Sequence, residues 1–455
     1  MFNAIANTLS NCFKIPELKS RIFFTAIVLG ICRLAALIPT PGLDNRALLA
    51  YFDRSTSDGN SLMGMYSLFT GGGFERCAIG ALGIMPYISA TIIIQLLTAV
   101  VPSLSKMARE EGGRVKIIQY GRYLTVALCL GQGFFMALGW ENAASIFPGF
   151  SGKLVIVDNL WWYRIQTMLV LTTGTMLLMW LGEQITERGV GNGISLIITI
   201  GILARLPQAG QGLWDMFGNA DSQVPKFYIV ILIALLCAVI AGVIAVTQGQ
   251  RKIPVQYAQR AVGKKVFSGG SSFMPLRVNY AGVMPVIFAQ AILMFPAQIF
   301  QFAGQHLEIP FLIRISSQLS QGQSLYLILY GLMILFFSYF WVATQFNEIQ
   351  IADDMKKSGG YIPGVRPGQP TSDFLHRCMS RITLAGAIFL TVIAVIPIIL
   401  YSQMRVPNGV AQFFGGTSML IMVGVMLDTM RQMESYLLMR HYDGFLKKGR
   451  LKGRF

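Results

Sequence analysis

The sequence predicts an all-α polytopic membrane protein, with ten transmembrane helices in two inverted five-helix halves that close like a clamshell around a half-helix plug. The first supporting observation is composition. The 455 residues are 54% hydrophobic and only 13% charged, which excludes a disordered chain and disfavours a soluble globular fold. The second is a set of ten apolar runs near the length of roughly 20 residues that crosses a bilayer core. The third is the order of the loops between these runs.

The ten apolar runs are the predicted spans. They cover residues 22–38, 77–100, 119–139, 163–181, 193–207, 226–247, 280–303, 325–346, 382–401 and 412–430.

Loop lengths indicate an internal repeat. The connections run long, medium, medium and short in the first five spans, and long, medium, long and short in the last five. Because each copy holds five spans, the second copy is inverted in the membrane, which places the working site near the midplane. We therefore expect an N-terminal half at 1–207, an outer hinge loop at 208–225, a C-terminal half at 226–430 and a basic tail at 431–455.

Positive charge is distributed unevenly over the predicted loops. If the N-terminus is cytoplasmic, 27 of the 37 Lys and Arg residues fall on the cytoplasmic side and eight on the opposite side. By the positive-inside rule, both termini are expected in the cytoplasm. The net charge of +16 then mainly reflects the excess of Lys and Arg in the cytoplasmic loops, which sets the orientation.

A membrane span begins twice between residues 61 and 100. A short apolar run over 61–74 stops at three glycines, and a second run over 77–100 has the full length, with Pro86 expected to kink it. A half-length helix on a glycine hinge lines or blocks a cavity, because irregular backbone cannot face lipid. We call residues 61–74 the plug segment. Its apolar and hinge residues are Leu62, Met65, Leu68, Phe69, Gly71, Gly72 and Gly73.

Isoleucines recur at similar depth in several spans. Ile84 and Ile88 are four residues apart, on one helix face, and Ile198, Ile287 and Ile421 lie in other spans. Each could simply pack or face lipid; together they could form a hydrophobic constriction that resists water and ions. Both readings stay open here.

Charge is sparse within the spans. Arg33 and Arg205 are the exceptions, with Glu183, Glu187 and Asp428 near inner ends. For Arg33 we expect a snorkelling or structural pairing role rather than substrate binding.

Two cytoplasmic loops form what we call the basic arms, residues 248–279 and 347–381. The first contains six cations and no acidic residue, and the second presents Arg366 in a Pro/Gly-rich turn. The arms could serve orientation and contact with anionic lipid. Their length favours docking of a macromolecule, either RNA-bearing or an acidic protein. The predicted docking residues are Arg251, Lys252, Arg260, Lys264, Lys265 and Arg366.

Cysteine and histidine usage gives no sign of metal chemistry. The six Cys and three His are scattered without ligand spacing, so we expect no metal and no cofactor. No catalytic motif lies inside a span, and we expect no enzymatic activity.

Six motifs in order along the chain carry a family resemblance. They are residues 80–97 (GALGIMPYISA followed by TIIIQLL), 38–42 (IPTPG), 186–195 (TERGVGNGIS), 255–260 (VQYAQR), 363–368 (PGVRPG) and 414–418 (FGGTS). Together they resemble the SecY/Sec61-alpha family, whose bacterial members form the central channel subunit of the Sec protein translocase. The resemblance covers nearly the whole chain.

The resemblance implies a role for each predicted site. Residues 61–74 would be the plug, the five isoleucines the pore ring, and spans two, three, seven and eight a lateral gate. Such a channel translocates unfolded secretory polypeptides and releases membrane segments sideways into lipid. Implied partners are the small subunits SecE and SecG, the motor ATPase SecA, the ribosome, signal sequences and lipid, and the implied location is the bacterial plasma (inner) membrane.

Two other classes of function compete with a channel. An inverted-repeat secondary solute transporter would need an intramembrane ion or proton site, which the sparse charge of the spans disfavours. An intramembrane enzyme would need a nucleophile–base pair or metal ligands at membrane depth.

Overall fold

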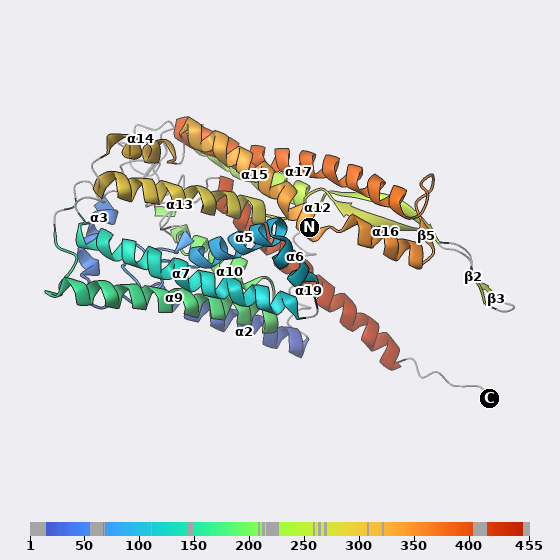
Figure 1. The fold of residues 1–455 in the computed structure, drawn as a ribbon, viewed down its shortest axis with the longest axis horizontal. Coiled ribbons are helices and arrows are strands. Elements are labelled where there is room, and N and C mark those ends of the chain that lie inside the picture. Colours follow the sequence, from blue (N-terminus) through green and yellow to red (C-terminus); the bar gives the residue numbers. More distant parts are fainter. Residues whose placement is uncertain are drawn as a thin grey trace.

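The computed structural model is a bundle of long helices with a small β-sheet at one end (Figure 1). It describes residues 15–54, 67, 69–110, 112–143, 150, 152–207, 210–211, 214, 227–257, 260–262, 265–267, 271–306, 309–320, 323–403 and 416–448. The helices are α2 (Pro16–Ala35), α3 (Asn45–Arg54), α5 (Met85–Val100), α6 (Pro102–Arg109), α7 (Gly113–Glu141), α9 (Leu160–Arg188), α10 (Gly193–Leu203), α12 (Phe227–Gln248), α13 (Met284–His306), α14 (Pro310–Gln318), α15 (Ser324–Gln345), α16 (Glu348–Lys357), α17 (Gln369–Gln403) and α19 (Gly416–Lys448).

Several of these helices can cross a membrane. Among the described residues, α7, α9, α12, α13, α15 and α17 are each long and apolar enough, and the bent pair α5–α6 would make a seventh span. Large apolar side chains such as Ile328 and Phe389 remain 67% and 58% exposed, as expected of a surface that faces lipid. The chain is therefore a multi-pass helical membrane protein; the count of ten spans stays a prediction.

The second predicted span is wrong at its beginning. Residues 70–84 form turns and α5 begins only at Met85. The reason is competition for backbone hydrogen bonds: the Thr40 N–H donates to Cys77 O at 2.7 Å, and Gly80 N–H donates to Ala35 O at 3.0 Å. Pro86 consequently occupies the first turn of α5 instead of kinking a longer helix, a position where its missing N–H costs nothing.

The other end of α5 is set by a second proline. Val101 adopts an extended conformation before Pro102, because the proline ring disfavours helical geometry in the preceding residue. Helix α6 then continues at an angle of 103° to α5.

Two later helices are longer than the apolar runs that predicted them. Helix α17 begins at Gln369, inside the predicted loop 347–381, and α19 continues to Lys448, through most of the predicted tail 431–455. Hydropathy detects only the part of a helix that lies in lipid, so polar extensions of the same helix are missed.

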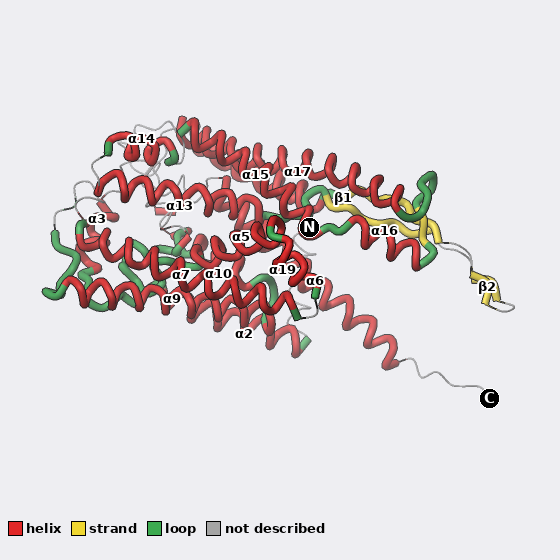
Figure 2. Tube along the Cα trace, in the orientation of Figure 1, coloured by secondary structure: helices red, strands yellow, loops and turns green. Residues whose placement is uncertain are grey.

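The basic arms contain the β-structure, which the sequence analysis did not predict. Strand β1 (Gln250–Tyr257) pairs antiparallel with β4 (Ser271–Arg277) and with β5 (Gly360–Tyr361), in the order β4-β1-β5. Strands β2 (Arg260–Val262) and β3 (Lys265–Phe267) form a separate hairpin. Figure 2 shows all of these strands at one end of the helical bundle.

The bundle has two groups of helices. In Figure 1, α2, α7 and α9 lie together on one side, and α13, α15 and α17 on the other. Helices α5 and α10 pack against the first group and α19 packs against the second, so the groups meet where α5 contacts α13 and where α10 contacts α19. The predicted hinge loop 208–225 lies almost entirely outside the described residues.

Helices α7 and α9 are fastened by an ion pair towards each end. Glu141 binds Arg164 at 2.9 Å and Glu183 binds Arg122 at 2.7 Å. Between them, the lack of a side chain at Gly133 lets α7 approach the backbone of Met168. These contacts hold α7 and α9 together along their length.

Candidate functional site

The five predicted ring isoleucines lie at four helices and share one buried cluster. Ile84 directly precedes α5 and Ile88 lies within it, Ile198 belongs to α10, Ile287 to α13 and Ile421 to α19. No side chain among them is more than 4% exposed, and all five belong to the same hydrophobic cluster. Burial excludes a lipid-facing position for each of them. Packing and constriction both remain compatible with it, so the ring stays a prediction.

The start of α5 fixes the first two isoleucines. Ile84 has φ −98° and ψ 2°, outside the helix, and its carbonyl accepts the Ile88 N–H at 3.2 Å. The two side chains therefore stand one turn apart on the same face.

A side-chain cap and a tight turn precede the helices that carry Ile198 and Ile287. Asn192 accepts the backbone N–H groups of Ile194 and Ser195 at 3.1 and 3.3 Å, which satisfies donors at the start of α10. Before α13, Gly282 has φ +63° and its carbonyl accepts a 2.8 Å hydrogen bond from the Asn279 amide. The loop turn at Gly282 leads directly into α13, so Ile287 lies in the first helical turn of α13.

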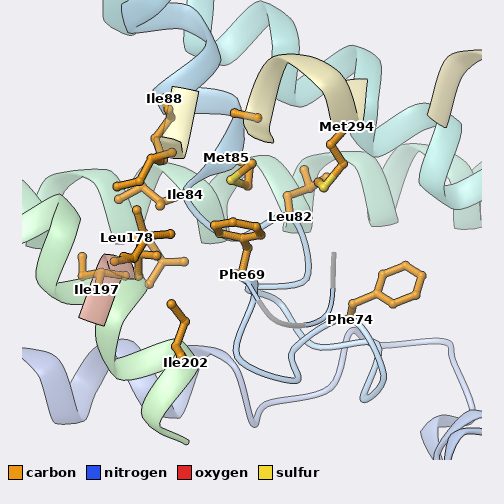
Figure 3. Close-up of a cluster of buried hydrophobic side chains, with 14 of the residues drawn as sticks. Phe69, Phe74, Leu82, Ile84, Met85, Ile88, Leu178, Ile197, Ile202 and Met294 are labelled. Atoms are coloured by element: carbon orange, nitrogen blue, oxygen red, sulfur yellow. The ribbon is translucent and has the colours of Figure 1, made fainter. Parts of the chain in front are cut away.

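The described part of the plug segment packs against the same cluster. Ser67 and Phe69 are helical and at most 4% exposed, and Phe69 belongs to the cluster with the isoleucines. Figure 3 shows the Phe69 ring beside Met85 and Leu82. The described part of the segment thus lies directly against the start of α5. Leu62, Met65 and Leu68 lie outside the described residues.

The predicted hinge glycines permit an unusual backbone. Gly71 and Gly72 have φ values of +61° and +84°, in the left-handed region that other residues avoid. A Cβ at Gly71 would lie 2.9 Å from the Cα of Gly201 in α10. Gly73 has no positive φ, although it packs close to Gly80. These glycines let the plug segment approach α10 backbone to backbone.

Two arginines of the predicted spans contact the plug segment and the glutamate that follows it, and sequence reasoning did not assign them to the site. Arg33 of α2 donates from Nη2 to Gly71 O at 3.0 Å. Arg205, just after α10, donates from Nη2 to Glu75 Oε1 at 2.5 Å and also to Ser67 Oγ. We call these five residues the plug seat. The expectation of a structural role for Arg33 holds, with the partner being the plug segment.

A signal for the plug seat existed in the sequence. The two arginines are the exceptional deep charges of the spans, and Glu75 follows the glycines by two residues. Deep charges pair with one another or with backbone carbonyls. Spacing alone could not tell which carboxylate or carbonyl each arginine would meet.

The plug seat borders a small cavity. Its volume is about 20 Å³, room for about one water molecule. The lining includes Arg33, Phe69, Thr70 and Ile84, so the polar plug seat and the apolar cluster meet there. Among the described residues, no group of three or more His, Cys, Asp or Glu side chains could hold a metal ion.

Three of the predicted docking residues belong to the three-stranded sheet or to the turn that follows it. Arg251 and Lys252 are exposed on β1, and Arg366 is exposed in the turn that follows β5. Arg260 and Lys265 lie in the β2–β3 hairpin, while Lys264 is outside the described residues.

The two basic arms are joined, which sequence reasoning did not predict. Gln256 of β1 pairs with Tyr361 of β5, and the Tyr361 hydroxyl donates to Gln256 Oε1 at 3.0 Å. Beneath them, Ile253, Leu276 and Ile362 are buried in one cluster with residues of α15 and α17. The arms therefore present a single supported surface.

Comparison with known proteins gives a consistent result. The SecY family model matches residues 78–430. The protein translocase subunit SecY of Chlamydia trachomatis is 45% identical over 457 residues, covering 98% of this chain and 99% of that protein. The Escherichia coli K12 subunit of the same name is 43% identical over 439 residues, with 96% of each covered.

Solved structures agree in fold. A structure described as that of a protein conducting channel matches with a TM-score of 0.65 at 18% identity, covering 94% of this chain and 97% of that one. Sec61 in the canine ribosome-channel complex matches with a TM-score of 0.62, also at 18% identity, with the same coverage. At these identities the likeness shows the fold alone.

Proposed function

The chain belongs to the SecY family, and we propose that it is the channel subunit through which unfolded secretory polypeptides cross the membrane and membrane segments leave sideways into lipid. The observation that carries this proposal is the burial of five isoleucines in one cluster where the two helix groups meet, with the described part of the plug segment packed against it.

The physical reasoning starts from the translocated polypeptide. Its backbone groups would be unsatisfied in hydrocarbon, so an unfolded chain cannot cross lipid directly. We propose a narrow waist whose side chains offer no hydrogen-bond partners, so that a translocating chain of any sequence is not bound there. The waist consists of Ile84, Ile88, Ile198, Ile287 and Ile421. The same apolar lining resists water and ions while the channel is idle.

Opening follows from the contacts between the two groups. We propose that residues 1–207 and 226–430 act as the two halves of a clamshell, hinged at 208–225. Helix α5 with α7 and helix α13 with α15 would border the lateral gate. An apolar signal sequence shifts the equilibrium only if it binds the open gate more tightly than the closed one.

The basic arms are the proposed docking surface for the partner that supplies the energy for translocation. We propose that they face the cytoplasm, as do both termini, and that Arg251, Lys252, Arg260, Lys264, Lys265 and Arg366 receive the motor ATPase SecA or the ribosome. The exposure of Arg251, Lys252 and Arg366 supports this. The chain itself would make and break no covalent bond.

Assembly and location follow from the family. We propose SecE and SecG as the small membrane partners, and the bacterial plasma membrane as the location. The C. trachomatis and E. coli relatives support a bacterial setting.

Reconstitution tests the proposed function. Vesicles that contain the chain with SecE and SecG are given SecA, ATP and a secretory precursor. The precursor should become protected from external protease only when its signal sequence is intact. A precursor without its signal serves as the control. Failure of protection while SecA is bound, or uptake of a small solute driven by a proton or sodium gradient, would contradict the channel.

A further inference from the structure

Three contacts hold residues 67–75, which are the last part of the plug segment and the glutamate that follows it. The acceptors are Ser67 Oγ, the Gly71 carbonyl and Glu75 Oε1, four residues apart along the chain, and every donor is the Nη2 atom of Arg33 or Arg205. Arg205 binds both ends of this stretch, Ser67 and Glu75. The stretch is therefore bracketed by one arginine and held at its middle by the other.

The ion pair in this set is shielded from solvent. The side chains of Arg205 and Glu75 are only 13% and 15% exposed. Arg33 and Arg205 both bind this stretch and Arg76 adjoins Glu75 in the chain, so the carboxylate of Glu75 offsets a locally positive site. Removing one partner of a shielded pair leaves the other charge without compensation, which is far more costly than losing an exposed pair.

The backbone just after the plug segment is fastened separately. The Ile79 N–H donates to Ile38 O at 2.9 Å, and Gly80 N–H donates to Ala35 O at 3.0 Å. These bonds attach residues 77–80 to the end of α2 without using either arginine. A movement of the plug segment can therefore break the arginine contacts while this base remains in place.

We propose that Arg205 and Glu75, assisted by Arg33 and Ser67, form a latch that positions the plug segment and keeps the idle channel closed; this rests on the proposed channel function. The contacts exist only while the segment is seated, and a contact present in one state alone shifts the equilibrium towards that state. A tenfold rise in the open population requires a loss of only about 1.4 kcal/mol. The arginines are thus positioning residues, distinct from the apolar waist.

Idle ion conductance in planar bilayers tests the latch. The assembled complex is measured without precursor or motor, with Glu75→Gln and Arg205→Gln as the primary variants. We expect each to raise the idle open fraction at least tenfold. The double variant should exceed Arg205→Gln only slightly, because paired residues are non-additive. Glu141→Gln is the matched control, since it breaks an ion pair of similar exposure with Arg164 away from the plug seat, and its conductance should equal the parent's.

A milder variant protects the test against misfolding. Ser67→Ala removes one acceptor of Arg205 and no charge, and we expect a severalfold rise in idle conductance. If Glu75→Gln and Ser67→Ala both conduct within twofold of the parent, or if the two glutamine variants add independently, the latch is wrong. Protection of a signal-bearing precursor from external protease is measured in every variant. Loss of this protection would identify a variant that no longer translocates, separately from any change in idle conductance.

Discussion

The proposed waist and the plug seat lie side by side, yet by our proposals each closes the channel by a different physical means. The waist consists of five isoleucines from four helices, all buried in one apolar cluster. The plug seat consists of directed hydrogen bonds from two arginines to three points of one short segment. Apolar contact is non-directional and tolerates volume-conserving changes of side chain, whereas an ion pair requires a defined geometry.

The difference suggests a division of labour. A waist without directed contacts can widen around a moving polypeptide and close again. A seat with directed contacts favours one position of the plug segment and is lost as a unit when the segment leaves. Substitutions that change polarity should therefore damage the waist most, and substitutions that change backbone geometry should damage the seat most.

The largest effect is expected for a charge in the waist. Ile287→Asp places a carboxylate where the isoleucine is 1% exposed, and an unpaired polar or charged group in such a site costs several kcal/mol. We expect a sustained ion leak in planar bilayers and a clearly lower melting temperature in detergent.

The conservative variant Ile287→Leu is the control for the waist. Volume-conserving substitutions usually cost under about 1.5 kcal/mol, so the idle conductance should stay near the parent's. Equal leak from the aspartate and leucine variants would mean that the apolar character of this position is irrelevant to the seal.

A side chain at the hinge should unseat the plug. Gly71→Val requires a β-branched residue at φ +61° and within 2.9 Å of the Gly201 Cα. The left-handed conformation alone costs about 1–2 kcal/mol, and the steric contact adds to it. We expect idle conductance to rise at least tenfold.

Gly30→Ala is the matched control for the hinge. Gly30 lies in α2, where a Cβ would meet nothing within 4 Å, and alanine in a helix interior gains about 0.5–1 kcal/mol over glycine. Conductance should be unchanged and the melting temperature slightly higher. A parent-like leak in Gly71→Val would show that the glycine geometry does not matter to closure.

Charge reversal on the basic arms should weaken docking without affecting either part of the seal. Arg251→Glu and Arg366→Glu alter exposed side chains, so the fold should persist. We expect roughly tenfold weaker binding of SecA or ribosomes to vesicles, with the difference shrinking as salt is raised.

Lys153→Glu serves as the control for docking, because Lys153 is exposed and, by the proposed orientation, lies on the opposite side of the membrane. Equal loss of binding in this variant would refute docking through the arms. A change in idle conductance of the arm variants would show that docking and sealing are not separate.

The smallest effect is expected for Pro86→Ala. Because Pro86 lies in the first turn of α5, alanine removes no kink, and the free energy of unfolding should change by about 1 kcal/mol or less. Melting in detergent measures this. A loss of several kcal/mol, with altered conductance, would indicate that the ring of Pro86 itself shapes the waist.

Sequence patterns predicted the fold class because hydropathy reports directly on contact with lipid. They also selected the five isoleucines that share one cluster, although spacing could not separate them from ordinary packing residues. The start of α5 was missed because its apolar run continues upstream of Met85. Only tertiary hydrogen bonds to residues 35–40 show that residues 77–80 are not helical.

The pairings that the sequence did not predict also depend on contacts between residues far apart in the chain. Arg205 and Glu75 are 130 residues apart, and β1 reaches β5 across about a hundred residues. Neither pairing has a local signature. Composition marked both regions as unusual, as deep charges in one case and as long basic loops in the other, without identifying the partners.

Cross-linking to a moving polypeptide tests the central claim most directly. Ile88→Cys, in a background without the six native cysteines, is combined with a secretory chain that carries one cysteine and is arrested midway. Ile388→Cys, at a position 48% exposed on α17, is the control. We predict a disulfide at position 88 only when the signal is intact and the motor or ribosome is engaged, and none at position 388. Silence at position 88, and at Ile84→Cys and Ile287→Cys, in a demonstrably engaged complex would contradict a waist formed by these isoleucines.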